Sequence, residues 1–204
     1  AKGEKGVGLY LVEATAANID IIADGIIDLT RDQAHVTFNA AVCTELAPDG
    51  AGDKALDDAI PSILTIVSAD MVGAGEWLLQ TTTGYAKTRV QFDRPLGFFQ
   101  AVKHPLVNVM IDIDRTKSLV YNSACAIDSG ESNTELNARM AKSQASDMAV
   151  FSASRAVQFH GGIGFTWECF IHLYFKRQKH SQLLWGDAAW HRAQLANILI
   201  GTAA

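Results

Sequence analysis

Two segments of the sequence combine side chains that can hold a phosphorylated ligand. The first, residues 89–100 (RVQFDRPLGFFQ), places an arginine, an aromatic residue, a Pro-Leu-Gly turn and a glutamine between two helical regions. A guanidinium held in this way can bind a pyrophosphate through two parallel hydrogen bonds. The alternative interpretation is a solvated loop in which Phe92 and Phe98 plug the end of a helical bundle.

The second segment, residues 158–168 (QFHGGIGFTWE), joins a glutamine to two adjacent glycines. Because glycine has no Cβ, Gly161 and Gly162 would let a ligand lie against bare backbone amides. The glycines alone are a weak signal, since many helices end in glycine. His160 is better explained as a structural histidine with its own hydrogen-bond partners than as a general base.

Other chemical signals are missing from the sequence. It contains no P-loop, GxSxG or HExxH motif and no GxGxxG motif preceded by a strand. Its cysteines, Cys43, Cys125 and Cys169, are isolated and odd in number, so they form neither a disulfide framework nor a zinc pattern. We therefore expect no metal site, and the cysteine usage favours a reducing cytoplasm.

Composition limits the class of protein further. Of the 204 residues, 49% are hydrophobic and 19% charged, so the chain can bury a sizeable core and is not wholly disordered. A formal charge of −5 argues against nucleic acid as the main partner. We also expect no membrane span, because acidic residues interrupt the apolar runs before they reach roughly 18 to 20 residues. These are Asp70, Glu76, Asp112 and Asp114.

Residues 1–52 have the pattern of a β region. Short runs typical of strands at 7–12, 19–22 and 35–39 are separated by Gly, Asp and Asn. Val36 and Phe38 share one face of the last run, which predicts a half-buried antiparallel strand. So few strands make a marginal sheet. Because the first residue is alanine and a strand follows at once, we interpret the chain as a fragment that begins inside a larger β domain.

From residue 53 the apolar pattern becomes helical. The stripe of the first helix begins at Ile60, with Pro61 in the first turn. A second stripe begins at Leu106, and Pro105 marks the start of that helix or kinks its first turns. Asp128-Ser129-Gly130 ends it.

A third helix opens after Asn133-Thr134 and ends at Gly161-Gly162, and its many small residues allow close approach to neighbouring helices. A shorter helix follows Gly186-Asp187. The predicted protein is mainly α. It has an antiparallel four-helix bundle over residues 53–204, preceded by a partial antiparallel β domain over residues 1–52.

The order of these features resembles the acyl-CoA dehydrogenase family. A long helix ends in Arg-x-Gln-Phe, a Pro-Leu-Gly-x-x-Gln turn follows, and a later helix ends in Gln-x-x-Gly-Gly-x-Gly. The resemblance covers essentially the whole chain. Residues 6–49 look like the second half of the family's middle β domain, and residues 56–200 like its C-terminal four-helix domain.

The resemblance implies FAD-dependent α,β-dehydrogenation of an acyl-CoA thioester. In the family a carboxylate removes the α-proton while hydride leaves for the flavin, and an electron-transfer flavoprotein or similar acceptor reoxidises it. Members assemble as dimers of dimers, homomeric or heteromeric, and FAD crosses a subunit boundary. The residues that would hold FAD are Arg89, Gln91, Phe92 and Gln100 from the turn, and Gln158, Gly161 and Gly162 from the glycine segment.

The catalytic base is where the sequence departs from the family pattern. Counting from Arg177 places Trp185 on the tyrosine and Gly186 on the glutamate of the usual Tyr-Glu-Gly-Thr, and Ile63 occupies the alternative glutamate position. Asp187, one residue later, is a relocated base, the N-cap of the last helix, both or neither. Two other functions stay open: a catalytically silent subunit of a mixed oligomer, and a non-enzymatic helical docking module.

Three further features have two interpretations each. The basic cluster at residues 176–180 would meet the phosphates of coenzyme A or form a solvated helix face, and we favour the latter. His191 and Arg192 are expected at the surface or an interface. Trp185 and Trp190 flank Asp187 and either roof a thioester pocket or pack in the core.

Overall fold

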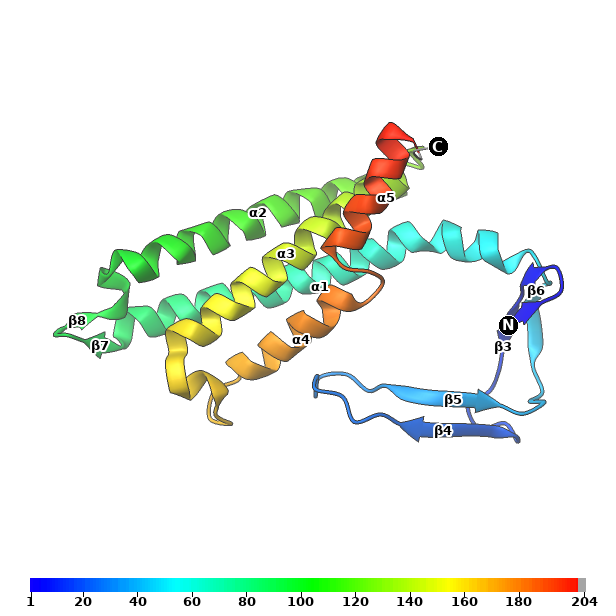
Figure 1. The fold of residues 1–204 in the computed structure, drawn as a ribbon, viewed down its shortest axis with the longest axis horizontal. Coiled ribbons are helices and arrows are strands. Elements are labelled where there is room, and N and C mark those ends of the chain that lie inside the picture. The colour runs from blue at the N-terminus through cyan, green and yellow to red at the C-terminus, as the bar shows by residue number, and fades with distance from the viewer. Residues whose placement is uncertain (202–204) are drawn as a thin grey trace. The chain divides into compact units, whose positions relative to one another are not determined.

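The computed structural model describes residues 1–201, most of which are helical, as predicted (Figure 1). The chain divides into two compact units, Ala1–Ile60 and Pro61–Ala204. The first unit holds most of the strands. The second holds four whole helices and most of a fifth.

Within the first unit the strands of the described chain form two-stranded antiparallel sheets. β1 pairs with β2, β3 with β6, and β4 with β5. The bounds are Lys2–Gly3 (β1), Gly6–Val7 (β2), Leu9–Leu11 (β3), Ile19–Ala23 (β4), Ala34–Phe38 (β5) and Thr44–Ala47 (β6). The β4–β5 ladder runs from Ile19 opposite Phe38 to Ala23 opposite Ala34. The predicted antiparallel strands are thus present.

The expected burial of one face of β5 was wrong. All five of its residues are exposed, with Val36 at 44% and Phe38 at 57% of their full accessibility. A half-buried strand needs a second layer against its apolar face. No described residues bury this face of the β4–β5 ladder. The sequence of β5 therefore alternates like that of a half-buried strand, although the strand is exposed.

The second unit is built around long helices. α1 spans Gly52–Thr88, α2 Gln100–Asp128, α3 Thr134–His160, α4 Ile171–Leu183 and α5 Ala188–Ile200. Short 3-10 helices, η1 (Leu96–Phe98) and η2 (Gly161–Phe165), precede α2 and follow α3. Strands β7 (Val90–Gln91) and β8 (Arg94–Pro95) form the hairpin between α1 and α2. The long helices run side by side and are joined at their ends (Figure 1), which is the predicted antiparallel arrangement.

α3 is the central helix of this unit. One apolar cluster joins Met71 of α1 and Ile113 of α2 to Met148 of α3, and a second joins Leu78 of α1 to Ala153 of α3 and Ile171 of α4. The buried face of α3 is lined by alanine and serine, which lets its neighbours approach closely. The predicted role of the small residues is therefore confirmed.

Both prolines lie inside their helices, and Pro61 lies further inside than predicted. α1 begins at Gly52, so Pro61 is in its interior rather than in its first turn. The first turns of α1 are exposed and carry the Lys54–Asp58 pair instead of an apolar stripe, which is why the stripe begins late. α2 begins at Gln100, so Pro105 does not mark its start.

No apolar stripe in the sequence indicates α4, although residues 176–180 were expected to form a solvated helix face. Ile171 is fully buried, but the rest of the buried face is polar and consists of His172, Gln178 and Ser181. A helix whose inward face is polar has no apolar stripe for a pattern to detect. The structure therefore contains one short helix more than the sequence predicts.

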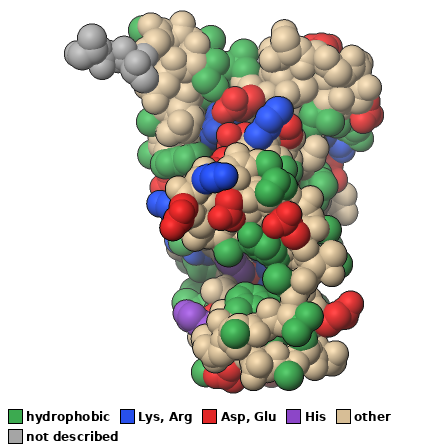
Figure 2. Space-filling model, turned by 90° about the vertical axis from the view of Figure 1, so that its right-hand side faces the viewer, with side chains coloured by type: hydrophobic (Ala, Val, Ile, Leu, Met, Phe, Trp, Pro, Cys, Tyr) green, Lys and Arg blue, Asp and Glu red, His purple; other side chains and the backbone are tan. Residues whose placement is uncertain are grey.

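The structure also bears on the expectations about membranes, surface charge and metal ions. By length and composition alone α1 could span a membrane, which differs from the expectation, but 44% of its most apolar window is buried and core helices pass the same test. On the face drawn in Figure 2 acidic and basic side chains are interspersed, so this face has no continuous basic surface. No group of three metal-ligating side chains occurs among the described residues.

Candidate functional site

The two segments predicted to hold a phosphorylated ligand, residues 89–100 and 158–168, lie at the same end of the helical unit. The Tyr85 ring near the end of α1 stacks on the His160 ring at the end of α3, with ring centroids 4.4 Å apart. The Arg89 amide donates to the Tyr85 carbonyl at 2.8 Å, and η2 follows His160 directly. The β7–β8 hairpin and η2 therefore extend from one stacked pair (Figure 1).

The β7–β8 hairpin turns at Phe92 and Asp93, both with positive φ (52° and 57°), as the two central residues of a type I′ turn require. The Leu96 amide donates to the Arg89 carbonyl at 2.8 Å and closes the hairpin. The side chains of Arg89 and Gln91 are exposed on it. Gln100 is exposed at the start of α2.

The plug interpretation of this segment was wrong. Phe92 is 88% exposed and Phe98 is 58% exposed. Phe99, which is half-buried, contacts both rings edge-on at centroid distances of 6.2 Å and 5.6 Å. Because the turn points Phe92 away from the helices, its ring is available to a ligand or to another chain.

The glycine segment is open but differs from expectation in one respect. A Cβ added to Gly161 or Gly162 would meet no atom within 4 Å, so both positions offer an unobstructed backbone. The Gly161 N–H, however, donates to the Val157 carbonyl and caps α3, so it is not a free donor. Its φ of 61° explains why glycine stands there. The Gln158 side chain is exposed beside it.

His160 is a structural residue, as predicted. It is 5% exposed, and its Nδ1 donates to the Ala156 carbonyl at 2.8 Å. Burial lowers the pKa of this imidazole, so it stays neutral near pH 7. Its contribution is to hold the ends of α1 and α3 together through Tyr85.

Together these residues fit the diphosphate of a dinucleotide cofactor. An exposed guanidinium, three exposed carboxamides and an open glycine backbone occur on two neighbouring loops at one end of the unit. Planar donors of this kind match phosphate oxygens. Since all of them face outward, they suit a ligand that is held partly by another subunit.

A second cluster surrounds the connection between α4 and α5. Trp185 and Gly186 have positive φ values of 61° and 97°. Asp187 is the N-cap of α5, and its Oδ1 accepts from the Trp190 amide at 2.8 Å. The N-cap interpretation of Asp187 is thus confirmed, whereas its role as a base stays a prediction. Trp185 and Trp190 are 47% and 46% exposed, so neither packs in the core.

Two buried ionisable groups lie beneath this connection. Lys142 of α3 is 0% exposed, and burial lowers its pKa to about 8 while Asp187 acts in the opposite direction. His191 of α5 is also 0% exposed, so its expected surface position was wrong. Burial, together with the charges of Lys142 and Arg139, lowers the His191 pKa to about 4. Arg192, by contrast, makes the expected surface contact, an ion pair with Asp147 at 2.7 Å.

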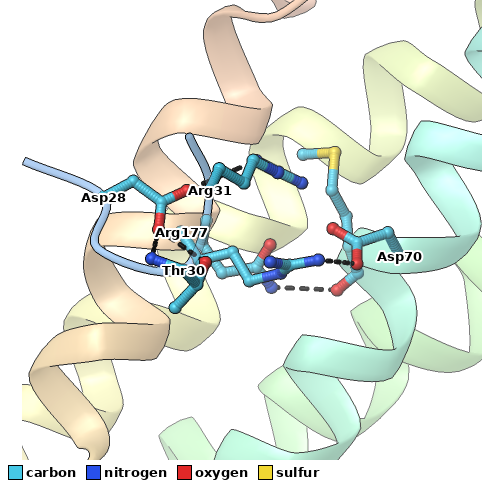
Figure 3. A network of polar contacts seen from close by, with 7 residues as sticks. Asp28, Thr30, Arg31, Asp70 and Arg177 are labelled. Carbon is cyan, nitrogen blue, oxygen red and sulfur yellow. Dashed lines mark hydrogen bonds and ion pairs between the residues drawn. The ribbon is translucent and has the colours of Figure 1, made fainter. Parts of the chain in front are cut away.

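The basic cluster of α4 is only partly a solvated face (Figure 3). Arg177 forms an ion pair with Asp70 of α1, and the buried Gln178 donates to the Met71 carbonyl at 2.9 Å. These contacts attach α4 to α1, so the solvated-face interpretation was wrong for both residues. Within the first unit, the same figure shows Asp28 accepting from Thr30, whose hydroxyl lies at 2.6 Å.

Comparison with known proteins identifies the family. A sequence model described as the acyl-CoA dehydrogenase C-terminal domain matches residues 65–200. The chain belongs to the acyl-CoA dehydrogenase family. It is 33% identical to acyl-CoA dehydrogenase IpdE2 of Mycolicibacterium smegmatis over 193 residues, covering 87% of this chain and 57% of the relative. It is 40% identical to IpdE2 of Mycobacterium tuberculosis over 119 residues, 58% of this chain and 36% of that protein.

Solved structures agree with this assignment. A variant of the steroid ACAD Tcur3481-Tcur3483 matches with a TM-score of 0.88 and 29% identity, over 98% of this chain and 54% of that one. The ChsE4-ChsE5 complex from Mycobacterium tuberculosis matches with a TM-score of 0.87 and 25% identity, over 100% and 55%. The chain thus spans about half the length of the chains in these two structures.

The α4–α5 connection is closely packed at Gly186. A Cβ on Gly186 would lie 2.5 Å from Cε3 of Trp190, so the indole fills the space that a side chain at 186 would enter. The sequence identified Gly186 and Asp187 but missed Lys142 and His191, which lie directly beneath them. A lysine in a helix normally predicts an exposed position. The only feature of the sequence that indicates the burial of Lys142 is the run of alanine and serine around it.

Proposed function

We propose that this chain takes part in FAD-dependent α,β-dehydrogenation of an acyl-CoA thioester. Residues 1–52 would be part of the middle β domain and residues 53–204 the C-terminal bundle domain. The observation that supports this best is the convergence of the Arg89 hairpin and the Gly161-Gly162 segment on the Tyr85–His160 stack, in a chain of this family. The proposed compartment is the cytoplasm, and the proposed electron acceptor an electron-transfer flavoprotein or similar protein.

In this proposal the chain binds the FAD of a neighbouring subunit, and bound FAD supplies the hydride acceptor. The Arg89 guanidinium would neutralise the diphosphate, and Gln91, Gln100 and Gln158 would supply hydrogen-bond donors for the same ligand. Gly161 and Gly162 allow the phosphates to approach the backbone. Phe92, which is almost fully exposed, would offer its ring to the ligand from the hairpin tip.

A second candidate function, the catalytically silent subunit of a mixed oligomer, has a specific observation in its favour. Trp190 occupies the space over Gly186, and the Asp187 carboxylate is engaged as the cap of α5. Two similar structures, ChsE4-ChsE5 and Tcur3481-Tcur3483, are described by pairs of names, and the second as a steroid ACAD. Carried over to this chain, these point to a mixed oligomer acting on a sterol side-chain or fatty acyl thioester.

The test uses the purified assembly that contains this chain. Visible absorbance near 450 nm would measure flavin content, and anaerobic addition of acyl-CoA thioesters would bleach it. If Asp187 is the base, Asp187→Asn abolishes bleaching and leaves flavin content unchanged. If the chain is silent, Asp187→Asn bleaches like the parent, and a partner with an intact glutamate copurifies. An assembly without flavin and without bleaching would leave only the docking-module function.

A further inference from the structure

The backbone of the α4–α5 connection adopts a conformation that it would not hold by itself. Trp185 has a φ of 61°, a left-handed conformation that is strained for a residue with a Cβ, and Gly186 follows with a φ of 97°. The connection between Leu183 and Ala188 is short. Such strain persists only where the surroundings determine the conformation.

Lys142 supplies the contacts that determine it. Its Nζ donates to the Gly186 carbonyl at 2.7 Å, to the Gln182 carbonyl at 3.1 Å and to the Ser146 hydroxyl at 3.1 Å. These three acceptors match the three protons of an ammonium group. One acceptor lies on α3, one in the last turn of α4 and one in the connection itself. A cation at a helix C-terminus is also favoured by the helix dipole.

The remaining contacts hold the connection from its other end. Nε2 of His191 donates to the Trp185 carbonyl at 3.1 Å, and the Trp190 amide donates to Asp187. The Arg139 guanidinium lies 5.2 Å from the Trp190 ring centroid. Among these contacts, only the Lys142 ammonium bridges α3 to both α4 and the connection.

We infer that Lys142 is the positioning residue of the α4–α5 connection, fixing the backbone from Trp185 to Asp187 from below. The Gly186 carbonyl is drawn inward, and the half-exposed Trp185 ring and the Asp187 carboxylate are presented in one arrangement. This inference rests on the proposed function only for the role of the connection in catalysis, where the family resemblance implies that Gly186 takes the place of the catalytic glutamate. The contacts themselves are independent of flavin and thioester.

The burial of Lys142 supports a specific task. Removing an ammonium from water costs several kcal/mol unless every proton finds an acceptor. A methionine or leucine would fill the same volume among the alanines of α3 without that cost. A lysine therefore adds something that packing alone does not: two of its three hydrogen bonds restrain the chain at residues 182 and 186, and the third, to Ser146, orients the ammonium on α3.

The test compares Lys142→Met with Lys179→Met by hydrogen exchange of backbone amides. Lys179 is the matched control, because this exposed lysine contacts the side chain of the same residue, Gln182, at 2.7 Å. In Lys142→Met we expect amides 184–191 to exchange at least tenfold faster while α2 keeps its protection. Lys142→Gln, which retains two N–H donors, should restore part of the difference, and Lys179→Met should match the parent. Equal protection of 184–191 in all variants, or faster exchange spread evenly over every helix, would overturn the inference.

A second measurement needs no substitution, so it decides the matter if Lys142→Met does not fold. In the parent chain labelled with 15N-lysine, the Lys142 ammonium protons should show magnetisation transfer to the Gly186 α-protons. Absence of that transfer overturns the inference. Neither measurement requires bound flavin, so a failure of the proposed function would be seen separately, in the absorbance experiment.

Discussion

Acid should destabilise the helical unit through His191. The imidazole has a pKa of about 4 in the folded chain and about 6.5 when unfolded, so between these values the unfolded chain binds a proton that the folded chain does not. The free energy of unfolding therefore falls as pH falls through this window. From pH 7 to pH 5 the loss due to His191 amounts to about 2 kcal/mol.

The structure explains why the folded chain rejects this proton. His191 is 0% exposed, its Nε2 already donates to the Trp185 carbonyl, and its Nδ1 has no hydrogen-bond partner among the described residues. A proton on Nδ1 would be buried without an acceptor and would face the positive charges of Lys142 and Arg139. The Asp187 charge raises the His191 pKa, but burial and the two positive charges lower it by more.

The assay is urea unfolding at pH 7 and pH 5, followed by circular dichroism. His191→Gln keeps an N–H donor and cannot titrate, so it should remove most of the 2 kcal/mol of acid sensitivity. His104→Gln, at an exposed position on α2, is the control and should keep it. Burial lowers the His160 pKa as well, so some acid sensitivity remains in every variant. If His191→Gln loses as much stability on acidification as the parent does, the reasoning is refuted.

Three further predictions concern the stability of the second unit. Gly186→Ala should lower the free energy of unfolding by roughly 2 to 3 kcal/mol, because its Cβ would strike the Trp190 ring. Gly130→Ala, at a position that is also left-handed but has open space around it, should cost less. Equal losses in the two variants would contradict this prediction. Asp187→Ala should lower the free energy of unfolding by about 1 kcal/mol because the N-cap of α5 is lost, whereas Asp187→Asn should change it very little. Thermal unfolding measures both effects, and equal melting temperatures of the two variants would exclude the cap. Leu78→Ala should cost roughly 2 to 5 kcal/mol in urea, and a loss below 1 kcal/mol would place this side chain outside the core.

The sequence predicts the parts of the fold in which local pattern and tertiary packing agree. The ends of α2 and α3 were predicted closely, because Ser129-Gly130 and Gly161 stop helices by their own backbone preferences. The strands at 19–23 and 34–38 were found for a similar reason, since their alternation is local. The pattern cannot tell whether a second layer covers the sheet, which is why the burial of Val36 and Phe38 was mispredicted.

The unpredicted parts depend on contacts between distant residues. No apolar stripe indicates α4 because its inward face is polar, and the buried Gln178 donates to the Met71 carbonyl, 107 residues away. Lys142 and His191 were missed for the same reason, since their surroundings come from α3, α4 and α5 together. The candidate site residues at the hairpin and the glycine segment were proposed from residue types and remain a prediction, whereas the proximity of the two segments follows from the Tyr85–His160 stack, which no local pattern indicates.

The most direct test of the account is the affinity of the assembled protein for FAD. Removing FAD from the assembly and titrating it back would give a dissociation constant for the parent, for Arg89→Met and for Lys87→Met. Lys87 is the matched control, an exposed cation in the last turn of the same helix. Loss of a charge-assisted bond to phosphate is worth about 1.5 to 3 kcal/mol, so Arg89→Met should weaken binding at least tenfold while Lys87→Met changes it little. Equal FAD affinity in the parent and in Arg89→Met would contradict the account.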